Sequence, residues 1–428
     1  MTSTARRVAI VGGQRIPFAR ANTAYNEASN QDMLTAALTS LVSKFDLKNQ
    51  KVGEVAAGAV IKHSRDWNLA RESTLGSGLH PETPAYDVQR ACGTSLTCAV
   101  QIAHRIAAGE IECGIAGGVD SSSDIPLSYG RQLQRSVLTM SRAKSLGEKI
   151  QSIGHLRPRD LAPAAPGIAE PRTGLSMGEH CEEMAKEWKI GRAEQDELAL
   201  ASHRNAAAAW KAGFFEDLVA PFGDLKYDNN VRSDTSLEKL ASLRTAFDRS
   251  PAGTLTAGNS SPLTDGAACV LLSSEDFAKS RGWPVLAYLT YSETAAVDYV
   301  GMAGPKEGML MAPAYAVPRM LDRAGLKLQD FDIYEIHEAF AAQVLCTLKA
   351  WESEDFCRKK LNREFLGSID RAKMNPVGSS VAIGHPFAAT GARIVATLAK
   401  ELAQRGAGRG LISICAAGGM GVTAILER

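Results

Sequence analysis

Two segments of this chain, far apart in the sequence, repeat the same order of small residues, helix and strand. The first begins at 91–95, continues as a helix with one apolar face and leads into an apolar strand over 111–119. The second begins at 389–391, continues as a similar helix and leads into a strand over 411–415. In both segments a glycine ends the helix and a glycine pair accompanies the strand. A chain built this way is predicted to fold as two related halves.

A second pair of segments supports the duplication. Leu47–Gln50 and Leu326–Gln329 share a Leu-Lys-x-Gln pattern, and each precedes a predicted strand. Short apolar strands such as Val8–Gly12 alternate with helical patterns such as Leu34–Phe45, which favours α/β layering.

The segment between the repeats differs from both halves, with prolines, polar clusters and weak strand signals. Within it, Arg131–Arg159 carries seven basic residues and one acidic residue, and its apolar residues fit an amphipathic helix or helical hairpin. The segment is either a solvated surface helix or an element over about 126–160 that contacts a membrane surface or a partner protein.

Composition excludes several classes of function. A formal net charge of +1 provides no global field for nucleic acid, which is not expected as a partner. The eight cysteines include no Cys-x-x-Cys pair and no zinc-ligand spacing, so we expect no metal site. We expect the cysteines to be free thiols in a reducing compartment. The N-terminal residues resemble no signal peptide and no run is long enough to span a bilayer, so we expect a cytoplasmic protein.

Cys92 is the first candidate for chemistry. It lies at the start of a predicted helix, where the helix dipole is expected to favour the thiolate and lower the pKa of the thiol. The alternative is a small buried hydrophobic residue, as expected for most other cysteines of the chain. A thiolate nucleophile needs a base, and His385 lies in a Gly-His-Pro loop before the second repeated helix. Because the halves are related, both residues are predicted at matching strand-to-helix corners, close together.

Two further residues lie at predicted strand ends. His337 follows the apolar strand 331–336, and Cys415 precedes a run of small residues whose backbone N–H groups could form an oxyanion hole. Four reactive side chains in such positions are hard to explain as four buried structural residues.

These motifs resemble those of the thiolase family along nearly the whole chain. The matching segments are Arg15–Phe18, the Cys92 segment, Thr256–Ser261 with Asp265–Ala268, His337–Phe340, Gly384–Pro386 and Cys415 with its glycines. The resemblance implies the α/β thiolase fold, with two duplicated layered αβαβα halves and an inserted loop domain. The implied boundaries are 1–121 with 262–285 for the N-terminal half, 122–261 for the loop domain and 286–428 for the C-terminal half.

The resemblance also implies a mechanism. His385 would take the proton of Cys92, which attacks a 3-ketoacyl-CoA and becomes acylated, while Cys415 protonates the acetyl-CoA enolate. His337 would donate a hydrogen bond to the thioester oxygen, and the N–H groups of Cys92 and Ala417 would form the second oxyanion hole. Ala417 stands where the family usually has a glycine. This change retains the backbone N–H donor but narrows the space near the thioester. Ser261 matches a serine near the pantetheine arm. Coenzyme A is then a co-substrate, and no tightly bound cofactor is expected.

Within the family, the chain is most similar to the β subunit of the fatty-acid-oxidation trifunctional complex and its bacterial anaerobic form. His337, in place of a usual asparagine, and the basic insertion carry that resemblance. It implies thiolysis in fatty acid β-oxidation, at least a homodimer, an enoyl-CoA hydratase/3-hydroxyacyl-CoA dehydrogenase α subunit as partner, and membrane contact through 126–160. The alternatives are a biosynthetic acetyl-CoA acetyltransferase, a ketoacyl synthase and a non-catalytic thiolase-like lipid-binding protein. Cys415 argues against the synthase.

Overall fold

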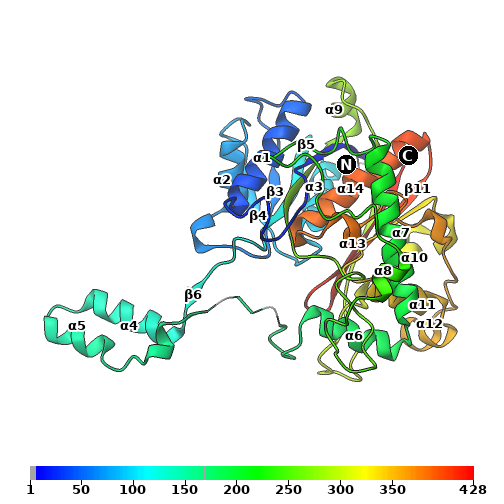
Figure 1. The fold of residues 1–428 in the computed structure, drawn as a ribbon. Coiled ribbons are helices and arrows are strands. Elements are labelled where there is room, and N and C mark those ends of the chain that lie inside the picture. The colour runs from blue at the N-terminus through cyan, green and yellow to red at the C-terminus, as the bar shows by residue number, and fades with distance from the viewer. Residues whose placement is uncertain (1–5, 165, 168) are drawn as a thin grey trace.

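The computed structural model describes residues 6–164, 166–167 and 169–428, and within these a ten-stranded mixed sheet forms the centre of the molecule (Figure 1). One part of the sheet has the order β1-β8-β5-β3-β4, and the other has the order β9-β12-β11-β10. The bounds of the first part are β1 Val8–Arg15, β8 Thr264–Ser274, β5 Cys113–Asp120, β3 Val55–Ala57 and β4 Ala85–Asp87, with β2 (Ala19–Arg20) paired to β8. Those of the second are β9 Ala287–Ala296, β12 Met420–Glu427, β11 Arg409–Ala416 and β10 Ile333–Ile336.

The two parts repeat one topology. In the first, β8 runs antiparallel to β1 and β5, and β5 runs parallel to β3. In the second, β12 runs antiparallel to β9 and β11, and β11 runs parallel to β10. A short antiparallel pairing of β1 with β9 joins them. The duplication predicted from the sequence is therefore confirmed at the level of strand order.

Helices cover the sheet and fill the space between the halves. Helices α1 (Asn30–Lys44), α2 (Leu69–Gly76) and α9 (Glu275–Ser280) pack on strands of the first half, and α10 (Ala312–Ala324) packs on strands of the second. Helix α11 (Ala341–Glu352) packs on α10, α12 (Glu354–Leu361) packs on α11, and the short α13 (Ser380–Ile383) packs on α7 (Arg192–Lys211) of the loop segment. Local sequence explains their starts: Ser29 and Asp32 form a reciprocal capping box at α1, which satisfies backbone N–H groups that a helix leaves free.

The two repeated helices, α3 (Thr94–Ala107) and α14 (Thr390–Arg405), pack against each other at the centre of the fold. Their first turns touch: a Cβ on Gly391 would lie 2.4 Å from the backbone nitrogen of Leu96, so only glycine permits this approach. The N–H of Ala392 donates to the Ser95 hydroxyl at 2.8 Å. This contact brings the starts of both helices, and the residues before them, to one place.

The loop segment is largely helical. It contains α4 (Arg131–Arg142), α5 (Leu146–Ile153), α6 (Met177–Glu187), α7 (Arg192–Lys211), α8 (Leu237–Ala241) and the short strands β6 (Ser128–Tyr129) and β7 (Pro163–Ala164). The pair α4 and α5 forms a helical hairpin, one of the two arrangements predicted for this segment, and Figure 1 shows it projecting away from the body of the molecule at the left. A search of the described residues found no helix with the length and apolar character needed to cross a membrane.

Candidate active site

Cys92 lies in a tight turn between β4 and α3. The preceding Ala91 has a φ of 44°, in the left-handed region that a side chain disfavours. The hydroxyl of Thr94 holds this turn, because it donates to the carbonyl of Ala91 at 2.7 Å and accepts from the N–H of Arg90 at 2.8 Å. Backbone strain of this kind persists only where neighbouring contacts fix it, and it is typical of functional sites.

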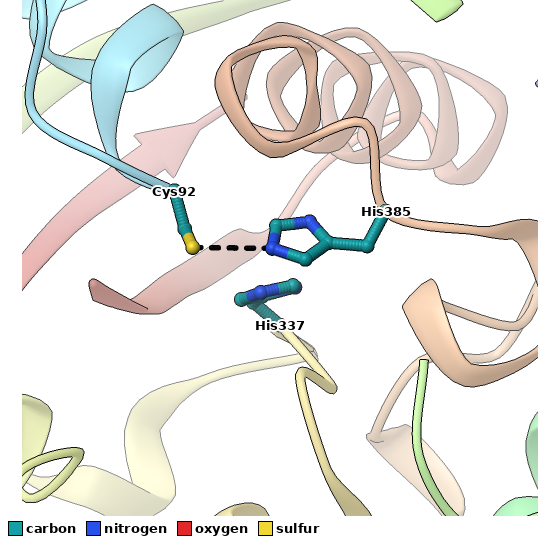
Figure 2. Close-up of side chains that lie close together, drawn as sticks. All are labelled: Cys92, His337 and His385. Atoms are coloured by element: carbon teal, nitrogen blue, oxygen red, sulfur yellow. Dashed lines mark hydrogen bonds between the residues drawn. The ribbon is translucent and has the colours of Figure 1, made fainter. Parts of the chain in front are cut away.

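His385 faces Cys92 directly. Its Nε2 lies 3.1 Å from the Cys92 sulfur, across 293 residues of sequence (Figure 2). Its Nδ1 lies 2.6 Å from the Thr390 hydroxyl in the first turn of α14. The juxtaposition predicted from the duplicated halves is confirmed. The prediction that both residues lie between a strand and a helix is wrong for His385, which follows the short helix α13 and not a strand. The two loops therefore resemble each other only in the helix that follows each of them.

His337 lies beside this pair, just after β10, as expected for a strand-end residue. The centres of the His337 and His385 rings are 4.2 Å apart, and Figure 2 shows the His337 ring beneath the line between Cys92 and His385. The His337 side chain is fully buried; its Nδ1 lies 2.8 Å from the Ser380 hydroxyl, while its Nε2 has no hydrogen-bond partner among the residues that the structure describes. An unpartnered buried nitrogen costs free energy unless a ligand satisfies it.

Cys415 and Ala417 come from the end of β11 and the turn that follows it. Cys415 is the second-last residue of β11 and is buried. Burial, and after it the charge of a nearby Cys92 thiolate, raise the pKa of the Cys415 thiol well above its usual value. The backbone N–H groups of Ala417 and of Cys92 itself both favour the Cys92 thiolate. The structure thus brings all four predicted side chains and both predicted backbone donors to one region, although their chemical roles stay predictions.

Electrostatics in the site oppose charge. Cys92 keeps partial solvent exposure, but the protein packed around its sulfur raises the pKa of the thiol to about 12. The backbone N–H groups near the sulfur lower this pKa, but their effect is smaller than that of burial. Burial, with the Arg393 charge, lowers the pKa of His385 to about 3 and that of His337 well below its usual value. The expected lowering of the Cys92 pKa by the helix start is therefore wrong. The resting pair is a neutral thiol and a neutral imidazole.

Three supporting residues were missed by the sequence analysis: Thr390, Ser380 and Asp120. The Asp120 carboxylate accepts from the backbone N–H of Ala388 at 2.8 Å and from those of Val60 and Ile61, so it ties the loop after His385 to the first half. Burial raises the pKa of Asp120 to about 7. The sequence shows polar residues near the Cys92 and His385 motifs, which was the only signal for these roles. It could not show which distant residues they contact.

A cavity of about 440 Å³ lies next to the site. Ser261 lines it, as do the basic side chains of Arg20 and Arg232. The backbone of Leu263, another lining residue, pairs with that of His385, which connects the cavity wall to the catalytic loop. Two basic residues, Arg20 and Arg232, therefore lie in the wall of a cavity beside the site.

Cys92, His337 and His385 also form, among the described residues, a group whose possible metal-ligating atoms lie within 4.8 Å of one another. Tetrahedral zinc would hold a sulfur and a nitrogen ligand about 3.5 Å apart. The observed separation of 3.1 Å between Cys92 and His385 is that of a direct hydrogen bond. The arrangement therefore fits a nucleophile with its base better than a metal centre.

Comparison with known proteins agrees with this geometry. Residues 8–276 match the family model "Thiolase, N-terminal domain", and residues 290–428 match "Thiolase, C-terminal domain". The fold and site define an acyltransferase of the thiolase type, and the chain belongs to the thiolase family.

Relatives extend over the whole chain. A 3-ketoacyl-CoA thiolase of Pectobacterium carotovorum is 45% identical over 434 residues, covering 100% of this chain and 98% of the relative. One from Yersinia pestis is 43% identical with the same coverage. Among solved structures, Bacillus anthracis acetyl-CoA acetyltransferase has a TM-score of 0.82 and 30% identity, each chain covered fully. Human mitochondrial 3-ketoacyl-CoA thiolase has a TM-score of 0.80 and 28% identity, covering 99% of this chain and 100% of the other.

Proposed function

We propose that this protein is a 3-ketoacyl-CoA thiolase, which uses coenzyme A to cleave 3-ketoacyl-CoA into acetyl-CoA and an acyl-CoA shortened by two carbons. The observation that carries the proposal is the Cys92–His385 hydrogen bond, with the partnerless Nε2 of His337 beside it. Full-length relatives named 3-ketoacyl-CoA thiolase support the substrate class.

In the first half-reaction, Nε2 of His385 takes the Cys92 proton as the sulfur attacks the 3-keto carbon. The bond between carbons 2 and 3 then breaks, its electron pair forms the enolate of acetyl-CoA, and the Cys415 thiol protonates carbon 2. The acyl group stays on Cys92. A base adjacent to the thiol is needed because the pKa of Cys92, raised to about 12, leaves little free thiolate.

In the second half-reaction, coenzyme A enters as the nucleophile. Its thiol proton passes to the Cys415 thiolate, and its sulfur attacks the acyl carbonyl. Cys92 leaves as thiolate and recovers its proton from His385, so the enzyme returns to its starting state. Backbone N–H groups of Cys92 and Ala417 bind the oxyanion of the tetrahedral intermediate, and Nε2–H of His337 binds the enolate oxygen.

Coenzyme A reaches this site through the cavity lined by Ser261. Arg20 and Arg232 supply positive charge for the phosphates. Ser261 is well placed to guide the pantetheine arm, because its backbone N–H donates at 2.9 Å to the carbonyl of Ala339, two residues beyond His337. CoA is a co-substrate in this scheme, and no resident cofactor is needed.

Mass spectrometry tests the acyl-enzyme. Brief exposure of the protein to a 3-ketoacyl-CoA, without free coenzyme A, should add one acyl group to the peptide containing Cys92. Adding coenzyme A should remove it. Cys98, buried on the helix α3 that follows Cys92, is the matched control and should stay unmodified. An acyl group that accumulates on another residue while Cys92 stays free would overturn the proposal.

In the reverse direction the same site would condense two acetyl-CoA molecules. The structural similarity to an acetyl-CoA acetyltransferase makes this condensation the second candidate function. The greater identity to 3-ketoacyl-CoA thiolases favours cleavage, in fatty acid β-oxidation. Thiolysis assays on substrates of increasing chain length separate the two: a condensing enzyme would accept only the four-carbon substrate.

The hairpin of α4 and α5 is proposed as a contact with an anionic membrane surface. Seven basic residues and one acidic residue lie in 131–159. Large apolar side chains are exposed on the same element, including Leu138 at 55%, Leu146 at 74% and Ile150 at 60%. Apolar side chains next to basic ones suit a negatively charged interface. Sedimentation with anionic vesicles should be lost when Leu146 and Ile150 are replaced by serine, with thiolysis in solution unchanged.

The proposal extends to the assembly of the protein. We expect at least a homodimer and an association with an enoyl-CoA hydratase/3-hydroxyacyl-CoA dehydrogenase subunit, by resemblance to the trifunctional complex. Native purification followed by mass measurement of the intact complex tests both. Location in the cytoplasm stays a prediction.

A further inference from the structure

A buried arginine lies behind the catalytic histidines, where the reaction itself does not use it. Arg393, on α14, is 1% exposed. Its only carboxylate within ion-pair distance, among the described residues, is Glu335 on β10, at 3.6 Å, and neither Glu335 oxygen has a hydrogen-bond partner. This is too long for a strong charged hydrogen bond, so a structural ion pair explains the buried guanidinium poorly.

The shortest contact of Arg393 is with Ser380. Its Nη2 donates to the Ser380 hydroxyl oxygen at 2.9 Å, and that oxygen lies 2.8 Å from Nδ1 of His337. The neighbouring backbone is held firmly: the N–H of Val381 donates to the Glu338 carboxylate at 3.2 Å. The chain Arg393–Ser380–His337 is therefore a fixed relay with one end in the active site.

Hydrogen-bond capacity determines the direction of this relay. A guanidinium only donates, so the Ser380 oxygen must accept from Arg393. The single hydroxyl proton of Ser380 then needs an acceptor, and Nδ1 of His337 is the partner in reach. A neutral imidazole that accepts at Nδ1 carries its proton at Nε2. That nitrogen is the one left without a partner in the site.

We propose that Ser380, oriented by Arg393, is a positioning residue that locks His337 in the Nε2–H tautomer and so presents a hydrogen-bond donor to the substrate's thioester oxygen. In the other tautomer His337 would present a lone pair to an oxygen that gains negative charge, and would repel it. The inference rests on the thiolase reaction proposed above, because that reaction needs a donor at this position.

The charges around His337 are consistent with a neutral ring. His385 and Arg393 both disfavour a second proton on it, and burial acts in the same direction. The carboxylate of Glu338, which could have opposed them, is occupied by the Ser202 hydroxyl at 2.7 Å and the Asn375 amide at 2.7 Å. His337 thus carries one proton, and the relay decides which nitrogen holds it.

The tautomer can be read directly. Nitrogen-15 NMR of histidine-labelled protein distinguishes a protonated from an unprotonated ring nitrogen, and a His337→Asn variant identifies the His337 signals. The wild type should show Nε2 protonated and Nδ1 unprotonated. Ser380→Ala should give a mixture of tautomers. The matched control is Ser379→Ala, which removes a hydroxyl that contacts the same guanidinium but not His337.

Kinetics give the second readout. Ser380→Ala should lower kcat by about 10- to 100-fold, part of the loss expected for an oxyanion donor, with KM changed less than about threefold. Ser380→Thr, which retains the hydroxyl, should restore both the tautomer and kcat. A wild-type Nδ1–H tautomer, or a Ser380→Ala variant that keeps pure Nε2–H, would overturn the inference. Absence of thiolysis by a wild type with the expected tautomer would instead refute the proposed function.

Discussion

Replacing His385 by asparagine should make the reactivity of Cys92 depend on hydroxide concentration. Burial raises the pKa of Cys92 to about 12. At about pH 8, four units lower, only about one molecule in 10⁴ would carry a thiolate without help, and that fraction rises about tenfold for each pH unit. In the wild type, Nε2 of His385 lies 3.1 Å from the sulfur and takes the proton during attack. Such a base is worth about 10²- to 10⁴-fold in rate.

Alkylation by iodoacetamide, followed by peptide mass spectrometry, measures this without a substrate. Between about pH 7 and pH 9, wild-type Cys92 should react at a nearly constant rate, because its base stays unprotonated throughout that range. In His385→Asn the rate should fall by about 10²-fold or more at pH 7 and climb about tenfold per pH unit. Cys98, with a pKa also raised to about 12 and no exposed surface, is an internal reference for an unassisted buried thiol.

Equal pH slopes in the wild type and His385→Asn would refute the reasoning, since they would show that His385 does not accept the proton. His203→Gln serves as the matched control. It removes another buried histidine, whose Nδ1 accepts from the backbone N–H of Arg232 and not from Cys92. Its Cys92 should alkylate like the wild type.

Three predictions concern stability. Asp228→Asn should lower the free energy of unfolding by about 3–5 kcal/mol in urea titrations, because it leaves the buried Arg15 guanidinium without its counter-charge. Gly419→Ala should cost about 1–3 kcal/mol in the same titration, since its φ is 71° and a Cβ would lie 2.6 Å from the Tyr299 ring. Burial lowers the pKa of His203 to about 4, so the native state binds fewer protons than the unfolded chain. His203 should therefore contribute a loss of stability of about 1.4 kcal/mol per unit as pH drops from about 6.5 towards 4, and the His203→Gln curve should be shallower than that of the wild type by this amount.

Each of these has a clear contrary result. An Asp228→Asn protein as stable as the wild type would mean that Arg15 finds another partner. A Gly419→Ala protein of unchanged stability would mean that the turn after β11 relaxes freely. Parallel pH curves for the wild type and His203→Gln would show that His203 is protonated in the folded state.

Local patterns in the sequence were sufficient to predict the two repeated helices and to select the main catalytic candidates. Small residues before a helix with one apolar face marked the starts of α3 and α14, and the repetition of that pattern placed Cys92 opposite His385. The basic apolar stretch over 131–159 predicted an amphipathic helix or a helical hairpin, and the structure has the hairpin. These predictions succeeded because period, capping and turn chemistry depend on residues only a few positions apart.

The partners of the catalytic residues could not be predicted in this way. Thr390 stands behind His385, and Ser380 with Arg393 stands behind His337, but serine, threonine and arginine near a motif are common and carry no distinctive pattern. Which of them meets a histidine depends on how α13 and α14 pack on β10. Only the folded chain determines that packing.

The sequence by itself determined that this chain duplicates an α/β unit and brings a cysteine and a histidine to the paired helix starts. The tertiary structure decided the charge state of those residues. A helix start favours a thiolate, and from sequence that effect alone predicted a lowered pKa for Cys92. Burial outweighs it, because the loss of hydration around the sulfur exceeds the stabilisation by nearby N–H groups. Desolvation depends on every neighbour that packs around an atom, and those neighbours come from both halves of the chain.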